Sequence, residues 1–364
     1  MNSKRLRIAD IIKTILEMTT LNMLLTEWDL INKLYFYVIK ASGSYRIKIN
    51  KEIAMKVVSL FSGIGGLDKG FEDAGFNVIW ANDFDKYAVQ TYSANYSNPI
   101  ILGDINQIHL PDIPDSDVII GGFPCQAFSM MGDQLGFEDA RGTLFFRIAE
   151  IIKDKINKDE KPKAIILENV RALRTHDRGR TFKTIERILR DDLGYKVFVD
   201  VLNSADYGVP QTRNRTYIVC FSNSEAEFEY PEKKPLEVTL QDRLEQNVPA
   251  KYFLSDKILP TILSNGTGGY KAKSEIDLPV ARPLCATMAK MHRACQDNYV
   301  TQNGKVRRLT PRECARLQGF EDSFIIPVSD SQAYKQFGNA VTVNVSRAVA
   351  EAVRKTLEDL GEWE

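Results

Sequence analysis

The chain has 364 residues, enough for roughly two domains of about 150 residues each and for a core that needs no disulfide or metal staples. Its composition of 44% hydrophobic, 26% charged and 10% aromatic residues excludes a disordered, collagenous or fibrous protein. The 48 basic residues balance the 48 acidic ones, so any affinity for nucleic acid must come from local patches and not from net charge.

Residues 1–54 precede the strongly patterned part of the chain and predict one or two amphipathic helices followed by a short basic strand at Tyr45–Asn50. Charged residues interrupt the apolar stretches Ile8–Leu25 and Trp28–Ala41, so neither supplies the ~20 apolar residues that span a bilayer. The N-terminus also lacks the pattern of a signal peptide. Five scattered cysteines without a C-x-x-C pair argue against a disulfide framework and a Cys-rich zinc site. We therefore expect a cytoplasmic protein with an accessory N-terminal extension of unknown role.

From Met55 to Phe221, short apolar strands alternate with helices. Strands are predicted at 56–61, 77–82, 117–121, 163–168, 196–202 and 215–221, and helices at 66–74, 84–96, 142–156 and 181–193. This alternation is typical of strand–helix–strand units, and it predicts an α/β fold with a doubly wound, mostly parallel sheet. Such sheets bind ligands at the carboxyl ends of their strands.

The pattern changes after Phe221. Residues 236–303 are rich in loops and show no helical period, which predicts a second, smaller domain. A short helix with proline at its start is predicted at Leu309–Gly319. An amphipathic helix is predicted at Val341–Leu357.

A glycine turn, Phe61-Ser62-Gly63-Ile64-Gly65-Gly66, follows the first predicted strand and allows close approach of backbone to a ligand. Asp68 occupies the third glycine position of G-x-G-x-x-G, which weakens a pyrophosphate-binding interpretation. Asp83 and Asp104 follow later in the chain, where carboxylates can accept from ribose hydroxyls or an adenine amino group. These features together favour a nucleoside cofactor, although aspartates that only cap helices or turns remain an alternative.

Other reactive side chains are predicted at later strand ends. Cys125 lies in a Gly/Pro loop that presents a thiol, although a lone cysteine is more often a small buried hydrophobe. The loop from Cys125 to Arg141 is long enough to act as a lid. Glu168 ends a strand, and Arg213 and Arg215 lead into another with their side chains on the same side. Their shared place at strand ends predicts that these side chains converge.

Seven sequence blocks, in this order, resemble the DNA (cytosine-5)-methyltransferases of the bacterial restriction–modification type. The blocks are 61–67, 122–129, 138–146, 168–170, 211–215, 308–319 and 336–341. The resemblance covers about residues 55–357 and matches 236–303 only as the family's variable region. It implies a catalytic and cofactor-binding domain, a target-recognition domain and a hinge that returns to the catalytic domain. The expected bounds are 1–54 for the extension, 55–235 completed by 338–364 for the catalytic domain, 236–310 for target recognition and 311–337 for the hinge.

The resemblance also implies a mechanism. Cys125 would add to C6 of a cytosine, Glu168 would hold or protonate N3, and Arg215 would contact O2 with support from Arg213. S-adenosylmethionine would then supply a methyl group to C5, and no metal is needed. The target cytosine is expected to be flipped out of the duplex. Met130-Met131 stands where the family's flipping loop often carries a small polar residue.

By the same resemblance, several residues contact S-adenosylmethionine. Asp83 is expected at the ribose hydroxyls, Phe84 on the adenine ring and Asp104 at the adenine amino group. Phe61 offers an aromatic face to the cationic sulfonium, and Asn339 reaches the methionine end. Further contacts are implied for Gly63, Gly65, Gly66, Leu67, Ile105, Pro124 and Val341.

Double-stranded DNA is the expected partner of a monomeric enzyme, with a cognate restriction endonuclease as a functional partner and no membrane partner. The basic stretches 171–190 and 282–316 are predicted to contact phosphates, unless they are merely solvated faces. Base readout is expected within 236–303. Side chains there with suitable donors and acceptors are Asn265, Tyr270, Lys290, His292, Arg293, Gln296 and Asn298, and each of them could instead only stabilise the loops.

Three other functions are compatible with parts of the sequence. A transfer-RNA cytosine-5 methyltransferase shares the Pro-Cys and Glu-Asn-Val blocks, but the long variable region argues against it. A nicotinamide-dependent oxidoreductase is disfavoured by the interrupted glycine motif. An inactive DNA-binding relative is disfavoured because Cys125, Glu168, Arg213 and Arg215 are all present.

Overall fold

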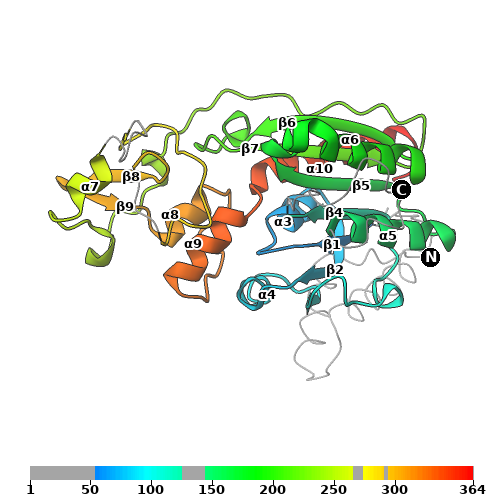
Figure 1. Cartoon of the computed structure of the whole chain (residues 1–364), viewed down its shortest axis with the longest axis horizontal. Coiled ribbons are helices and arrows are strands. Elements are labelled where there is room, and N and C mark those ends of the chain that lie inside the picture. Colours follow the sequence, from blue (N-terminus) through cyan, green and yellow to red (C-terminus); the bar gives the residue numbers. More distant parts are fainter. Residues whose placement is uncertain (1–53, 125–143, 265–273, 291–293, 364) are drawn as a thin grey trace, which may run out of the picture. The chain divides into compact units, whose positions relative to one another are not determined.

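The structure is a computed structural model that describes residues 54–124, 144–264, 274–290 and 294–363 (Figure 1). The helices and strand predicted before residue 54 lie outside the described residues, as do Cys125 and the loop that follows it. Within the described ranges, no helix combines the length and apolar character needed to cross a membrane.

A seven-stranded sheet has the order β3-β2-β1-β4-β5-β7-β6 (Figure 1). Its strands are β1 (Lys56–Leu60), β2 (Asn77–Asp83), β3 (Ile100–Leu102), β4 (Val118–Gly122), β5 (Ala164–Val170), β6 (Lys196–Asn203) and β7 (Asn214–Phe221). Neighbouring strands are parallel, except that β7 runs antiparallel to β5 and β6. The edge strand β3 is missing from the predicted elements because its three residues are too few to show a period.

Helices cover both faces of the sheet, which confirms the predicted doubly wound, mostly parallel fold. On one face, α3 (Gly66–Asp73) and α10 (Val343–Asp359) contribute Phe71, Val349 and Val353 to a core with alternate strand residues. On the other face lie α5 (Leu144–Asn157) and α6 (Arg180–Arg187), which continues as a π-helical turn (Ile188–Asp192). Strands that are buried on both faces appear in the sequence as continuous apolar runs. The strands could therefore be predicted from the sequence.

The strand order reverses between β1 and β4, which lie side by side in parallel. Leu60, the last residue of β1, pairs with Gly121 near the end of β4. The glycine turn after β1 and the Gly/Pro loop after β4 therefore leave the sheet at the same edge. Such a reversal opens a crevice at the carboxyl ends of the strands, where doubly wound proteins bind ligands.

Residues 236–303 are loop-rich where the structure describes them, as predicted, but a hairpin that the sequence prediction missed begins there. Strand β8 (Tyr299–Gln302) pairs antiparallel with β9 (Lys305–Arg308). The connecting residues, Asn303 and Gly304, both have positive φ, at 53° and 73°. An Asn-Gly pair between short apolar runs is the strongest local hairpin signal, because both residues tolerate that conformation.

Further short helices complete the described fold. They are α4 (Lys86–Ser93), α7 (Leu259–Leu263), α8 (Pro311–Arg316) and α9 (Asp330–Asn339). Single 3-10 turns lie at Leu110–Asp112, Arg171–Arg174, His176–Gly179, Ser204–Tyr207, Gln241–Arg243 and Ala250–Tyr252. The predicted helix at Leu309–Gly319 is present as the shorter α8, whereas α9 was not predicted.

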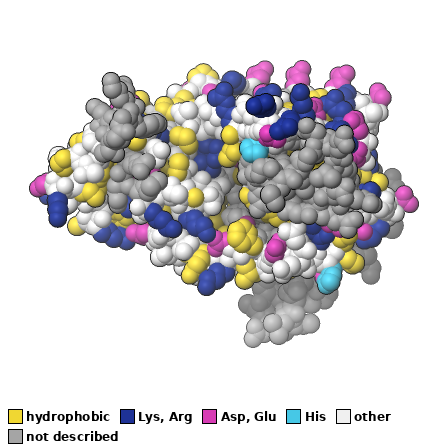
Figure 2. Space-filling view, in the orientation of Figure 1, with side chains coloured by type: hydrophobic (Ala, Val, Ile, Leu, Met, Phe, Trp, Pro, Cys, Tyr) yellow, Lys and Arg dark blue, Asp and Glu magenta, His cyan; other side chains and the backbone are white. Residues whose placement is uncertain are grey.

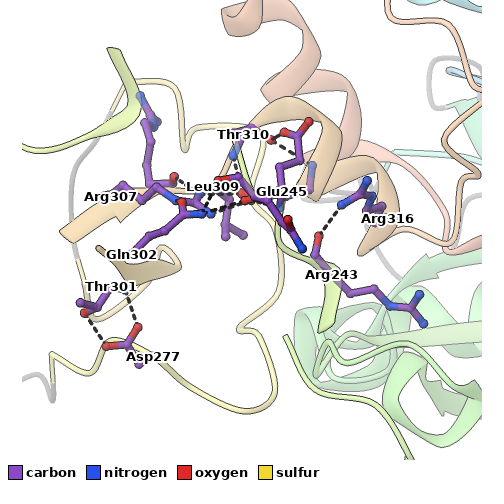
Figure 3. A network of polar contacts seen from close by, with 12 residues as sticks. Arg243, Glu245, Asp277, Thr301, Gln302, Arg307, Leu309, Thr310 and Arg316 are labelled. Carbon is purple, nitrogen blue, oxygen red and sulfur yellow. Dashed lines mark hydrogen bonds and ion pairs between the residues drawn. The ribbon is translucent and has the colours of Figure 1, made fainter. Parts of the chain in front are cut away.

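A buried polar network ties the hairpin to α8 (Figure 3). The Arg307 guanidinium donates to both oxygens of Glu313 at 2.7 and 2.8 Å, and neither side chain is exposed. Glu313 also accepts from the backbone N–H groups of Thr310 and Glu245. Loss of one partner of a buried ion pair costs about 3–5 kcal/mol. The network therefore holds the β8–β9 hairpin, α8 and the segment around Glu245 in one arrangement.

Candidate active site

Glu168 lies near the carboxyl end of β5, with Arg215 beside it on the antiparallel β7. Arg215 Nε is 2.9 Å from Glu168 Oε1. The contact lacks hydrogen-bond geometry, so this buried oxygen has no hydrogen-bond partner among the described residues. Burial raises the pKa of Glu168, and the nearby Arg215 and Arg213 oppose this only in part. The result is a buried, ion-paired carboxyl group with one oxygen that no hydrogen bond satisfies, which suits a substrate that offers a polar edge.

The strand and loop around Glu168 leave room for its carboxyl group. Gly122 of β4 pairs with Glu168, and a Cβ at Gly122 would lie 3.4 Å from Glu168 Oε2. Asn169 donates from Nδ2 to the Phe123 carbonyl oxygen at 2.7 Å. This bond fixes the start of the loop that leads to the exposed Pro124. The structure thus places Glu168 and the loop's first residues together, whereas Cys125, next in the chain, is not described.

Arg213 and Arg215 have different surroundings, although the sequence predicts both on one side. Arg213 is buried and donates to the carbonyl oxygens of Leu284, Gly338 and Ala340 at 3.0, 3.0 and 2.8 Å. Burial lowers its pKa to about 9. Arg213 therefore fastens β7 to two distant segments, and Arg215 alone of this pair contacts Glu168 in the structure.

Two residues that the sequence prediction did not single out help to build this site. Besides Asn169, Gln211 is fully buried and uses both ends of its amide. Its Nε2 donates to the Leu317 carbonyl at 2.6 Å, and its Oε1 accepts from the Leu284 N–H at 2.8 Å. Both residues lie inside the matched sequence blocks, but their roles depend on partners elsewhere in the chain.

At the other side of the crevice, the ends of β1, β2 and β3 are tied together. Asp83 accepts from the N–H groups of Gly63 and Asp85 at 2.9 and 2.8 Å. Asn82 donates to the carbonyl oxygens of Ile101 and Gly103. Burial raises the pKa of Asp83. A carboxylate has about four acceptor positions, so Asp83 retains acceptor capacity for a ligand.

The same edge presents features that suit a nucleoside. Phe84 is 69% exposed, which is unusual for a phenylalanine. A Cβ placed on Gly63 or Gly103 would meet no atom within 4 Å, so the backbone there borders open space. Asp104 is exposed and accepts from the backbone and side chain of Asn106. An aromatic face, bare backbone and nearby carboxylates are the groups that a nucleoside cofactor needs.

Val341 joins the two sides of the crevice. Its carbonyl oxygen occupies the place that a Cβ on Gly66 would take, and its Cγ2 would be 3.8 Å from a Cβ on Gly122. Asn339, predicted at the cofactor, is exposed at the end of α9. Leu67 and Ile105 are instead buried in the two cores, so any contact of theirs with a ligand would be through the backbone.

Several basic side chains in both predicted basic stretches form ion pairs with acidic side chains. Within 171–190 and its flank, the pairs are Arg180–Asp177, Arg187–Asp192 and Arg190–Glu186. Figure 2 shows this mixture of basic and acidic side chains on the part of the face where α6 lies. Within 282–316, the pairs are Arg282–Glu275, Arg307–Glu313 and Arg316–Asp322. Exposed basic residues such as Arg171, Arg178, Lys290 and Lys305 remain suitable for phosphate contacts.

Beneath the glycine turn, Asp68 of α3 is completely buried. Its carboxyl oxygens accept from Ser59 Oγ at 2.9 Å and Tyr92 Oη at 2.8 Å. Burial raises its pKa to about 7, because these two hydrogen bonds only partly offset the loss of water.

The free energy of unfolding of the wild-type protein is expected to fall, relative to that of Asp68→Asn, as pH rises from about 4 to about 7. The folded protein holds the Asp68 proton up to about pH 7, whereas an unfolded chain releases it near the ordinary pKa of 3.8. Raising the pH in this window therefore favours the unfolded state, by at most about 1.4 kcal/mol per unit. Urea unfolding at a series of pH values measures the difference, and parallel curves for the two proteins would contradict it.

Three kinds of similarity connect the chain to known proteins. Residues 55–355 match the family described as C-5 cytosine-specific DNA methylase. The Type II methyltransferase M.NlaX of Neisseria lactamica is 42% identical over 316 residues, which are 83% of this chain and 97% of that protein. M.HhaI of Haemophilus parahaemolyticus is 36% identical over 85% of this chain and 98% of its own. Among solved structures, Entamoeba histolytica EhMeth is 21% identical with a TM-score of 0.67, covering 84% of this chain and 99% of its own, and shares the fold.

Proposed function

The chain belongs to the C-5 cytosine-specific DNA methylase family and is a DNA cytosine-5 methyltransferase of the Type II restriction–modification class; on that premise, we propose that it methylates a flipped-out cytosine through a covalent adduct with Cys125. Family membership implies S-adenosylmethionine as the methyl donor. The observation that carries the mechanistic proposal is Glu168, a buried carboxyl group that pairs with Arg215 through an oxygen that no hydrogen bond satisfies.

Cys125 is the proposed nucleophile. Cytosine C5 is a poor nucleophile until a group adds at C6, and a thiolate is the strongest side-chain nucleophile near neutral pH. S-adenosylmethionine, when bound, supplies an electrophilic methyl group. Once C5 is methylated, loss of the C5 proton and β-elimination of the Cys125 thiolate restore the aromatic ring. The hydrogen bond from Asn169 to Phe123, two residues before Cys125, supports the assignment because it anchors the start of this loop.

Glu168 and Arg215 are proposed to bind the cytosine ring and to stabilise the charge that develops on it. Addition at C6 pushes electron density onto N3, and a protonated carboxyl group can donate to N3 at that moment. Burial raises the pKa of Glu168 and so favours this protonated form. Arg215 is assigned to O2 of the same ring, which its contact with Glu168 supports, while Arg213 is assigned to hold β7 from the interior.

The crevice at β1, β2 and β3 is the proposed S-adenosylmethionine site. Asp83 is assigned to the ribose hydroxyls, the exposed ring of Phe84 to the adenine and Asp104 to its amino group. Phe61 is assigned to the sulfonium and Asn339 to the methionine end. The open space beside the Gly63 backbone supports this site, since the cofactor has no pyrophosphate and needs only close approach.

Double-stranded DNA is the proposed substrate, with base readout by residues 236–310 and chemistry in 55–235 completed by 338–364. The segment 311–337 would be the hinge that connects the readout region back to the catalytic domain. Asn298 is unsuited to readout because its amide is buried and bonds both backbone groups of Arg282. Lys290 and Gln296 are exposed candidates for readout, while the other four lie outside the described residues. A monomeric enzyme that protects host DNA from a cognate endonuclease completes the proposal.

Expression in a host that lacks cytosine-5 methylation should place 5-methylcytosine at one recurring sequence of the host DNA. Bisulfite sequencing measures this, with a Cys125→Ser chain as the inactive control. The purified protein should methylate duplex DNA and leave transfer RNA unmodified, which separates the two cytosine-5 methyltransferase functions. Modification of transfer RNA alone, or the absence of any recurring DNA sequence, would overturn the proposal.

A further inference from the structure

The glycine turn after β1 has a strained backbone. Gly63 and Gly65 have φ of 57° and 82°, which glycine adopts readily. Phe61 has φ of 56°, in the left-handed region that a bulky side chain normally avoids. Such a conformation persists only where the surrounding structure holds it in place. Contacts with neighbouring elements therefore hold this turn.

A chain of buried hydrogen bonds runs from the turn to α4. Ser62 Oγ, in the turn, lies 2.9 Å from Ser59 Oγ, which is 2.9 Å from Asp68 Oδ2. The other oxygen of Asp68 accepts from Tyr92 Oη at 2.8 Å, and Tyr92 Oη accepts from Asn98 Nδ2 at 2.9 Å. Strand β1, helix α3 and helix α4 thus meet at one carboxyl group.

Tyr96, just beyond the end of α4, holds the turn at a second point. Its hydroxyl donates to the Gly65 carbonyl oxygen at 2.7 Å. Its ring stacks on Tyr92, with ring centroids 4.3 Å apart, and occupies the place that a Cβ on Gly65 would take. The two tyrosines therefore brace both the side chain of Asp68 and the backbone of the turn.

Helix α4 also begins at the part of this site that follows β2. Asp85 caps its N-terminus by accepting from Tyr87 and Ala88, and it directly follows Asp83 and Phe84. The residues assigned to the ribose and adenine, and the glycine turn with Phe61 assigned to the sulfonium, are thus fastened to one short helix. A shift of α4 would move both parts of the site together.

We propose that Asp68, Tyr92 and Tyr96 are positioning residues that hold the turn at 61–66 in the conformation that binds S-adenosylmethionine. The proposal rests on the cofactor site assigned above. None of the three side chains needs to touch the cofactor. They act through Ser62 and Gly65, and through the strained Phe61 beside them.

Calorimetric binding of S-adenosylmethionine tests the proposal without any turnover. Tyr96→Phe removes one hydrogen bond and should raise the Kd of S-adenosylmethionine about twofold to tenfold. Asp68→Ala leaves two buried hydroxyls without their acceptor and should raise it about tenfold or more. Asp68→Asn keeps one acceptor, and its amide nitrogen can donate to the other hydroxyl oxygen, so it should restore part of the affinity. The Kd for duplex DNA should stay unchanged in all three.

Tyr195→Phe is the matched control. Tyr195 also donates to a carbonyl oxygen, that of Pro162, at 2.9 Å, but on the β5 side of the sheet, away from the turn. The proposal fails if Tyr96→Phe and Asp68→Ala bind S-adenosylmethionine as wild type does, or if Tyr195→Phe weakens it equally. Failure of the wild-type protein to bind S-adenosylmethionine would instead refute the cofactor site itself. If Asp68→Ala does not fold, Tyr96→Phe still decides.

Discussion

Replacement of Cys125 by serine is expected to abolish methyl transfer while binding of DNA and S-adenosylmethionine persists. The hydroxyl is nearly the same size as the thiol, but it is scarcely ionised near neutral pH and adds to C6 far more slowly. Loss of an enzyme's nucleophile typically lowers kcat on the order of 10⁴-fold or more. Transfer of a radiolabelled methyl group to duplex DNA measures the rate, and gel shift and calorimetry measure the two affinities.

Cys285→Ser is the control for this substitution. Cys285 is an exposed thiol in the described part of the chain. It lies near enough to Arg213 and Arg215 for their charges to oppose the rise that partial burial causes in its pKa. It should be replaceable with little loss of rate. Wild-type protein and Cys285→Ser should also form a covalent complex with DNA that contains 5-fluorocytosine, because fluorine at C5 cannot leave as a proton. If Cys285→Ser were inactive and Cys125→Ser active, the nucleophile would be wrongly assigned.

The sheet was predictable because its signal is local. Each of β1, β4, β5 and β7 is a short apolar run, and burial on both faces leaves no alternation to confuse the pattern. The carboxyl-end rule then placed the glycine turn and Glu168 at one edge. The three-residue β3 gave no such signal. The β8–β9 hairpin did carry one, Asn303-Gly304, which the sequence prediction missed.

The polar interior was not predictable, because its partners are distant in the chain. Arg213 reads like Arg215 in sequence, yet it bonds carbonyl groups 71 to 127 residues away and is buried. Asp68 reads as a defect in a glycine motif, and its role appears only when α4 brings Tyr92 against it. In both cases the sequence shows the residue type. Its hydrogen-bond partners, however, are set by how separate elements of the fold pack together.

Glu168→Gln is expected to lower kcat by about 10²–10⁴-fold, the usual share of a positioned acid in catalysis. The amide has the same shape, but it cannot give up a proton to N3 when Cys125 adds at C6. Its effect on the Kd for S-adenosylmethionine should be small, because the carboxyl group lies at the β4–β5 side of the crevice. Single-turnover rates with saturating DNA and cofactor measure the chemical step. Glu186→Gln, which removes the α6 carboxylate that pairs with Arg190 of the following turn, should leave the rate unchanged.

The pH dependence of kcat separates loss of an acid from loss of structure. Burial raises the pKa of Glu168, and the reaction uses its protonated form. The wild-type rate should therefore decline as pH rises through that raised pKa, after the opposing gain from ionisation of Cys125 is taken into account. In Glu168→Gln the decline should disappear and the rate should only rise with thiolate formation. The amide that Glu168→Gln introduces has no acidic proton to donate to N3. A variant rate within about twofold of wild type, or an unchanged alkaline decline, would therefore show that Glu168 is not the acid.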